Sequence, residues 1–70
     1  MKDYKYIQTY HSIGTYWSCK IEYQKKLYVL TIDGKNSIFG KDTFEGDSIY
    51  HRGVMTISEA ITRYNNRAFL

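Results

Sequence analysis

The sequence contains no proline and a single cysteine, Cys19, among its 70 residues. One cysteine cannot form an internal disulfide, and it excludes zinc sites built on paired cysteines. No apolar run approaches the length of a membrane span, and residues 1–14 lack the apolar segment of a signal peptide. We therefore expect one soluble domain, residues 1–70, in the reducing environment of the cytoplasm.

The excess of positive over negative charge is small, because ten basic and seven acidic residues give a net charge of +3. Residues 1–32 carry five lysines against two acidic residues, a local charge of +3. Residues 33–52 have a local charge of −1, and residues 53–70 a local charge of +1. This mildly basic N-terminal half is compatible with nucleic-acid binding without requiring it.

Aromatic residues are abundant, at 17% of the chain, with eight tyrosines and one tryptophan. Ordering a chain of this length costs roughly 100 kcal/mol of conformational entropy. Aromatic side chains bury a large area while ordering few torsions, so they help a short chain to offset that cost. The composition therefore predicts a folded protein and argues against intrinsic disorder.

Residues 15–33 are predicted to form the centre of the fold. The apolar residues between Trp17 and Tyr23 alternate with polar or small ones, which is the pattern of a half-buried strand. A polar break at 24–26 leads into a second β-rich run, 27–32. We interpret the two runs as a hairpin that supplies most of the core.

The hairpin has two possible registers. A two-residue loop would place Cys19 opposite Leu30, whereas a four-residue loop would place it opposite Ile32. Both keep the same apolar face, since the two registers differ by an even shift. The break has no Asn-Gly or Asp-Gly pair, and this absence favours the longer loop.

The flanking segments predict further strands. Residues 3–10 fit a first strand with its tyrosines on one side, and 11–14 fit a turn. Asp33-Gly34 is a turn signal, and a three-residue loop there would set Ile38 opposite Leu30 in a third strand, 36–39.

Beyond this strand, polar glycine turns at 40–42 and 45–47 flank Phe44, which we expect to contact the core. Residues 48–51 fit a short edge strand with Ile49 pointing inward.

The C-terminal part predicts a helix over 57–65. Thr56 and Glu59 fit a capping box, and Glu59 can pair with Arg63 one turn later. The residues on one face of this helix are apolar, namely Ile57, Ala60, Ile61 and Tyr64. The predicted fold is thus α+β, a small antiparallel sheet of three to four strands with one C-terminal helix packed on one face.

No residue pattern points to catalysis or to a bound cofactor. His51 lies close to Asp47 and Ser48 in one loop, where a base and a nucleophile rarely reach working geometry. His11, His51 and Cys19 lack the close spacing of metal ligands, and Gly40-Lys41 is not part of a phosphate-binding loop. We therefore expect no enzyme activity, no cofactor and no metal.

The reverse face of the hairpin carries Tyr16, Leu27 and Val29 beside Lys20. Such a face is less polar than a solvated sheet requires, so it is either covered or a binding surface. Tyrosine with a few charges is typical of protein-binding hot spots. In size and character the chain also resembles the small accessory proteins of phages and mobile elements, which often block a host enzyme or defence complex.

The first hypothesis is therefore a protein-binding inhibitor or regulator that acts by occlusion. The alternative is a nucleic-acid binder, since tyrosines interleave with lysines in the N-terminal half. A third is self-association through an open sheet edge, giving a homodimer. The candidate partner-binding residues are Tyr4, Tyr6, Tyr10, Tyr16, Lys20, Lys25, Lys26, Leu27 and Val29.

Overall fold

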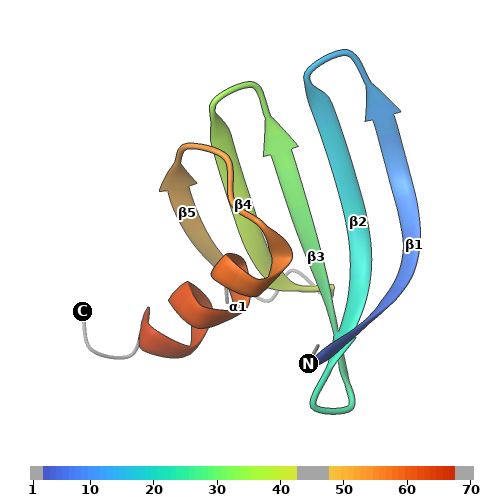
Figure 1. Cartoon of the computed structure of the whole chain (residues 1–70), viewed down its shortest axis with the longest axis vertical. Coiled ribbons are helices and arrows are strands. Elements are labelled where there is room, and N and C mark those ends of the chain that lie inside the picture. Colours follow the sequence, from blue (N-terminus) through green and yellow to red (C-terminus); the bar gives the residue numbers. More distant parts are fainter. Residues whose placement is uncertain (1–2, 43–47, 68–70) are drawn as a thin grey trace.

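A computed structural model describes residues 3–42 and 48–67. It shows one five-stranded antiparallel sheet in the order β1-β2-β3-β4-β5, with one helix after it (Figure 1). The elements are β1 (Tyr4–Ile13), β2 (Tyr16–Tyr23), β3 (Lys26–Asp33), β4 (Asn36–Lys41), β5 (Ser48–Arg52) and α1 (Ile57–Asn66). The α+β prediction is confirmed. The expected three to four strands were too few, because every strand segment pairs with its neighbour in sequence.

Strand β1 is longer and less regular than predicted. It continues to Ile13, so the first turn lies at Gly14-Thr15 instead of at 11–14. Its register shifts between Tyr6 and Gln8, and again between Thr9 and His11. Each extra residue of such a bulge interrupts the alternation of side chains between the two faces. The prediction that all the tyrosines of this strand share one face is therefore wrong.

The β2–β3 hairpin has the shorter of the two possible loops. Tyr23 pairs with Lys26, which leaves Gln24 and Lys25 as the turn, with φ of 52° and 65°. Two positive φ values are the mark of a type I′ turn, whose twist matches that of the strands. The preference for a four-residue loop was wrong, since this turn forms without its usual Asn-Gly pair. The predicted core face is unchanged, and Cys19 lies opposite Leu30.

The β3–β4 connection differs from the prediction by one residue. Asp33 pairs with Asn36, so the loop is Gly34-Lys35 and Leu30 faces Phe39 instead of Ile38. A one-residue shift moves every side chain of a strand to the other face. The observed register fully buries Phe39 and leaves Ile38 47% exposed. The larger side chain thus takes the core position.

The same shift corrects the predicted turn at 40–42, because Gly40 and Lys41 belong to β4. The expected contact of Phe44 lies outside the described residues.

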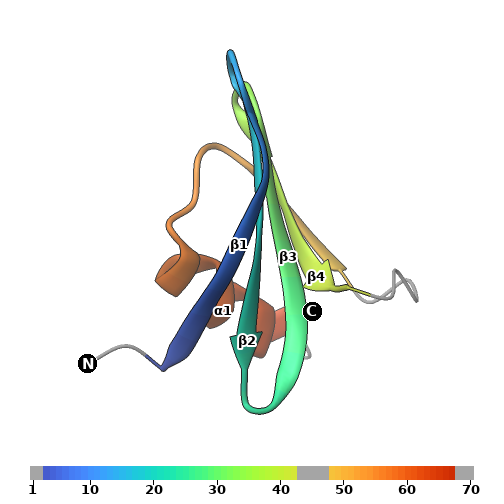
Figure 2. The same ribbon diagram turned by 90° about the vertical axis from the view of Figure 1, so that its right-hand side faces the viewer.

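Helix α1 covers one face of the sheet and leaves the other without a described element against it (Figure 2). The rings of Tyr28 and Phe39 stack with centroids 5.4 Å apart, and Tyr64 meets both edge-on at 5.2 and 5.5 Å. Such aromatic pairs each contribute about 0.5–1.5 kcal/mol beyond their buried area. This cluster fixes α1 on the sheet. The buried core consists of Cys19, Ile21, Tyr23, Tyr28, Leu30, Phe39, Met55, Ala60, Ile61 and Tyr64.

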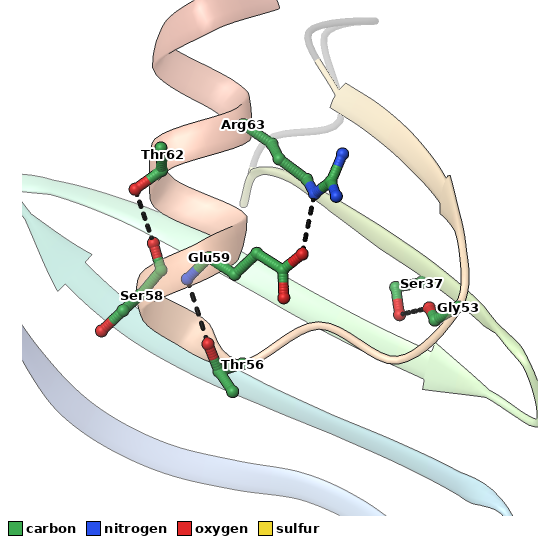
Figure 3. Close-up of polar contacts among 7 residues, drawn as sticks. All are labelled: Ser37, Gly53, Thr56, Ser58, Glu59, Thr62 and Arg63. Carbon is green, nitrogen blue, oxygen red and sulfur yellow. Dashed lines mark hydrogen bonds and ion pairs between the residues drawn. The ribbon is translucent and has the colours of Figure 1, made fainter.

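The start of α1 agrees with the hydroxyl half of the predicted capping box, whereas the Glu59 carboxylate contacts Arg63 (Figure 3). The Thr56 hydroxyl accepts a hydrogen bond from the Glu59 backbone N–H at 3.1 Å. The Glu59 carboxylate pairs with Arg63 at 3.0 Å, as expected. The helix ends at Asn66, one residue later than predicted.

The segment between β5 and α1 is anchored to the sheet as well. Ser37 of β4 donates to the Gly53 carbonyl oxygen (Figure 3), and Met55 is 2% exposed. Ile49 packs against the core, as predicted for the short last strand.

Candidate partner-binding face

The side of the sheet opposite α1 is called the open face below. Its outward side chains follow from the register, because directly paired residues of an antiparallel sheet share one face. Successive rows across the strands are Tyr16, Asp33, Asn36 and Arg52; Ser18, Thr31, Ile38 and Tyr50; Lys20 and Val29; and Glu22 and Leu27. Strand β1 adds Lys5, Gln8, Tyr10, His11 and Ile13 beside them.

Large apolar side chains are exposed on this face. Tyr16 is 40% exposed, Leu27 43%, Ile38 47% and Tyr50 65%. Ile38 and Tyr50 are direct cross-strand partners, so together they form one apolar patch on β4 and β5. Sheets that have one solvated face usually carry polar side chains there. The open face departs from that pattern at these four positions.

A hollow of about 330 Å³ lies on the open face above β2 and β3. The second bulge of β1 brings Tyr10 and His11 to the same side, and the His11 ring meets Tyr16 edge-on with centroids 5.7 Å apart. Bulges are often found where a strand must re-aim a side chain. The hollow is lined by Tyr10, His11, Tyr16, Ser18, Val29, Thr31 and Asp42.

Lys20 lies next to this hollow and contacts two of its lining residues, Tyr10 and Asp42. Its Nζ lies 3.3 Å from the Asp42 carboxylate and 5.4 Å from the centroid of the Tyr10 ring. Hydrogen bonds to Tyr10 and then to Asp42 raise the pKa of Lys20. The ammonium group therefore stays charged at neutral pH, and its charge is already paired. It ties β1 and the end of β4 to β2.

A second hollow, of about 300 Å³, lies nearer the β2–β3 turn. Lys26, Leu27 and Lys41 line it together with Asp42, which also lines the first hollow. The two hollows share Asp42 in their linings, but Lys26 and Lys41 are paired with the core residues Tyr23 and Tyr28, so the second hollow lies partly on the α1 side of the sheet.

The described strands, together with Asp42 directly after β4, place equal numbers of opposite charges on the open face. The cations are Lys5, Lys20 and Arg52, and the anions are Glu22, Asp33 and Asp42. Lys5 lies opposite Glu22 across the β1–β2 pair, as Lys20 contacts Asp42. The basic excess of the N-terminal half is thus not concentrated on this face.

The structure brings most of the predicted site residues together. Tyr10, Tyr16, Lys20, Leu27 and Val29 share the open face, whereas Lys26 lines the second hollow and pairs with Tyr23 of the α1 side. Lys25 is exposed at the tip of the turn.

Two predicted tyrosines lie on the other side of the sheet. Tyr4 packs against the core, and Tyr6 exchanges a hydrogen bond with the Thr9 hydroxyl. Both belong to the face that α1 covers, since they pair with Tyr23 and Ile21.

Sequence reasoning missed several residues of the open face, among them His11, Ile38, Asp42 and Tyr50. His11 and Asp42 were assigned to turns, and Ile38 was assigned to the core through the wrong register. A comparison of Ile38 with Phe39 for the core position was the available signal, because the larger aromatic gains more from burial.

Reactive groups are few in the described ranges. Burial raises the pKa of the Cys19 thiol to about 11, and Cys19 is fully buried on the α1 side of the sheet. Residues 3–42 and 48–67 contain no cluster of three or more side chains suited to hold a metal ion. Over the same ranges no helix is long and apolar enough to cross a membrane.

Comparison of the chain with protein-family models, with curated proteins and with solved structures finds no match.

Proposed function

We propose that this chain is a non-enzymatic protein-binding module that docks its open face on a larger protein and inhibits or regulates that protein by occlusion. The observation that carries the proposal is the exposure of Tyr16, Leu27, Ile38 and Tyr50 on a sheet face with no described element against it. Contiguous exposed apolar surface marks interaction sites in small proteins. Tyrosine-rich patches of this kind supply hot-spot contacts.

The size of the face suits occlusion. The two larger extents of the molecule are 32 and 27 Å. A face within these limits is comparable with the area of about 800 Å² that each partner buries in an interface of standard size. On its other face the sheet packs against α1 through the aromatic cluster of Tyr28, Phe39 and Tyr64. The open face is therefore a preformed surface.

The charge balance supports a protein partner over nucleic acid. Binding to a phosphate backbone depends on unpaired basic groups that release counterions. On the open face Lys20 is paired with Asp42, and Lys5 faces Glu22. The tyrosines expected to stack bases are divided between the two faces, since Tyr4 and Tyr6 lie on the α1 side.

Affinity capture from the native host, with matched variants, tests the proposal. Leu27→Asp combined with Ile38→Asp places charges at two exposed positions of the open face and leaves the core intact. Thr62→Asp, on the exposed side of α1, is the control. We expect the native chain and the control to retain one specific protein and the double variant to lose it. Retention by the double variant would contradict the placement on the open face.

Binding to mixed-sequence oligonucleotides distinguishes the nucleic-acid alternative. We expect no change in fluorescence anisotropy at low salt. Binding that weakens steeply as salt increases would favour the alternative, because the slope reports the number of phosphates neutralised.

A further inference from the structure

The two outer edges of the sheet differ in how they are protected. Strand β1 carries two bulges, and bulges are one way in which proteins prevent edge strands from pairing with other chains. Strand β5 pairs with β4 without any register shift, from Ser48 opposite Gly40 to Arg52 opposite Asn36. Within the described ranges no strand pairs with its outer side (Figure 1). The regular edge is therefore the one open to strand addition.

The sequence of β5 suits antiparallel pairing with a copy of itself. Centred on Tyr50, such a pairing sets Ile49 opposite His51 of the second copy and Ser48 opposite its Arg52. Arg52 is the one fully charged residue of β5, so no like charges face each other directly. The strand has neither of the two common edge protectors, lysine and proline.

The edge of β5 lies close to the last turns of α1. A hollow of about 280 Å³ beside β5 is lined by Ile49, Tyr50, Arg63, Asn66 and Arg67. Arg63 is paired with Glu59 at 3.0 Å, and the Arg67 guanidinium lies 3.6 Å from the centroid of the Tyr64 ring. Both arginines are thus held against their own helix, so they need not repel their counterparts across the edge.

We infer that the chain forms a two-fold symmetric dimer in which β5 pairs antiparallel with β5 of a second copy. The two five-stranded sheets join into one continuous sheet, and the two Tyr50 side chains meet across the dyad on the open face. The dyad stands perpendicular to the sheet, so both open faces point to the same side. This inference goes beyond the proposed function, and it would give that function two linked binding surfaces.

Sedimentation equilibrium over a concentration series tests the dimer. We expect the native chain to reach twice the chain mass at high concentration. Tyr50→Lys places two ammonium groups face to face at the dyad and should weaken dimerisation at least tenfold, equivalent to about 1.4 kcal/mol. Tyr6→Lys, at an exposed tyrosine of the bulged edge strand, is the control and should leave the dimer unchanged. A monomer at every concentration would overturn the inference, as would equal weakening by both variants.

Disulfide trapping provides a second test that does not depend on the lysine variant. Directly opposite residues of an antiparallel pair have Cβ atoms about 4.5–5.5 Å apart, close to disulfide distance after small adjustment. Tyr50→Cys should therefore form a covalent dimer under mild oxidation, whereas Tyr6→Cys should not. The buried Cys19 does not interfere, since its pKa is raised to about 11. Equal trapping of both variants would contradict the β5 interface. Failure of the partner-capture experiment would contradict the proposed function and not the dimer.

Discussion

At the scale of single residues, Cys19 shows how burial removes the reactivity of a thiol. The side chain is fully buried, and desolvation raises its pKa from 9.0 to about 11. The higher pKa lowers the thiolate fraction near pH 8 by about 100-fold, and the thiolate is the reactive form. This residue is part of the core and takes no part in the proposed binding.

We therefore expect Cys19 to react with a thiol reagent at least about 100-fold more slowly in the native protein than in the unfolded chain. Absorbance-based labelling at pH 8, with and without urea, measures the two rates. Equal rates would show that the strand around Cys19 is open in solution.

Thr56 provides a residue-scale test of the helix start. Its hydroxyl accepts from the Glu59 N–H, and the loss of such a cap costs about 1 kcal/mol. Urea unfolding of Thr56→Ala should show this decrease in the free energy of unfolding.

The matched control for the cap is Thr62→Ala within α1. Thr62 donates to the Ser58 carbonyl oxygen on the exposed side of the helix, and alanine is the better helix former there. We expect Thr62→Ala to be neutral or slightly stabilising. A loss in the control that equals the loss in Thr56→Ala would remove the case for a specific cap.

At the scale of elements, the sequence allowed the strands and the helix to be predicted, but not all of their registers. Alternation identified the core face of β2 and β3, and the pattern of Thr56 and Glu59 located α1. The β3–β4 register was missed because a loop longer by one residue gives an equally regular strand with the opposite face inward. Only the competition between Ile38 and Phe39 for the core decides between them.

The bulges of β1 were beyond reach from the sequence. A bulge is defined by the pairing of two strands, and residues 4–13 alone fit a regular strand equally well. The position of Tyr10 depends on a bulge, and so does the hollow that it lines. The candidate site was therefore predicted in part, through Tyr10, Tyr16, Lys20, Leu27 and Val29. The bulge that places Tyr10 on this face and the contribution of His11 were not predicted.

The β2–β3 turn leads to a prediction about stability. Gln24 and Lys25 have φ of 52° and 65°, a region where side chains other than Asn and Gly are strained. Gln24→Asn combined with Lys25→Gly should therefore raise the free energy of unfolding by about 1 kcal/mol. Thermal or urea unfolding measures the gain.

Lys35→Gly is the control for this turn, because Lys35 has no positive φ. There glycine adds only freedom to the unfolded chain, so we expect no gain in stability. A gain of equal size at Lys35 would mean that the effect does not come from the left-handed backbone.

At the scale of the whole molecule, the structure has two unlike faces. One is occupied by α1 and carries the aromatic core, and the other combines balanced charges with exposed apolar side chains. The helix and the core can thus be understood as the support of a preformed surface. On this account the function depends on the open face, and substitutions on the outer side of α1 should have little effect on binding.

Site-specific photocrosslinking in the native host tests this account most directly. Tyr16 and Tyr6 are similarly exposed, at 40% and 44%, but they lie on opposite faces of the sheet. A photoreactive phenylalanine analogue in place of either residue conserves the aromatic ring. The account predicts a specific crosslinked protein from position 16 and none from position 6. A partner crosslinked from position 6 and not from position 16 would contradict it.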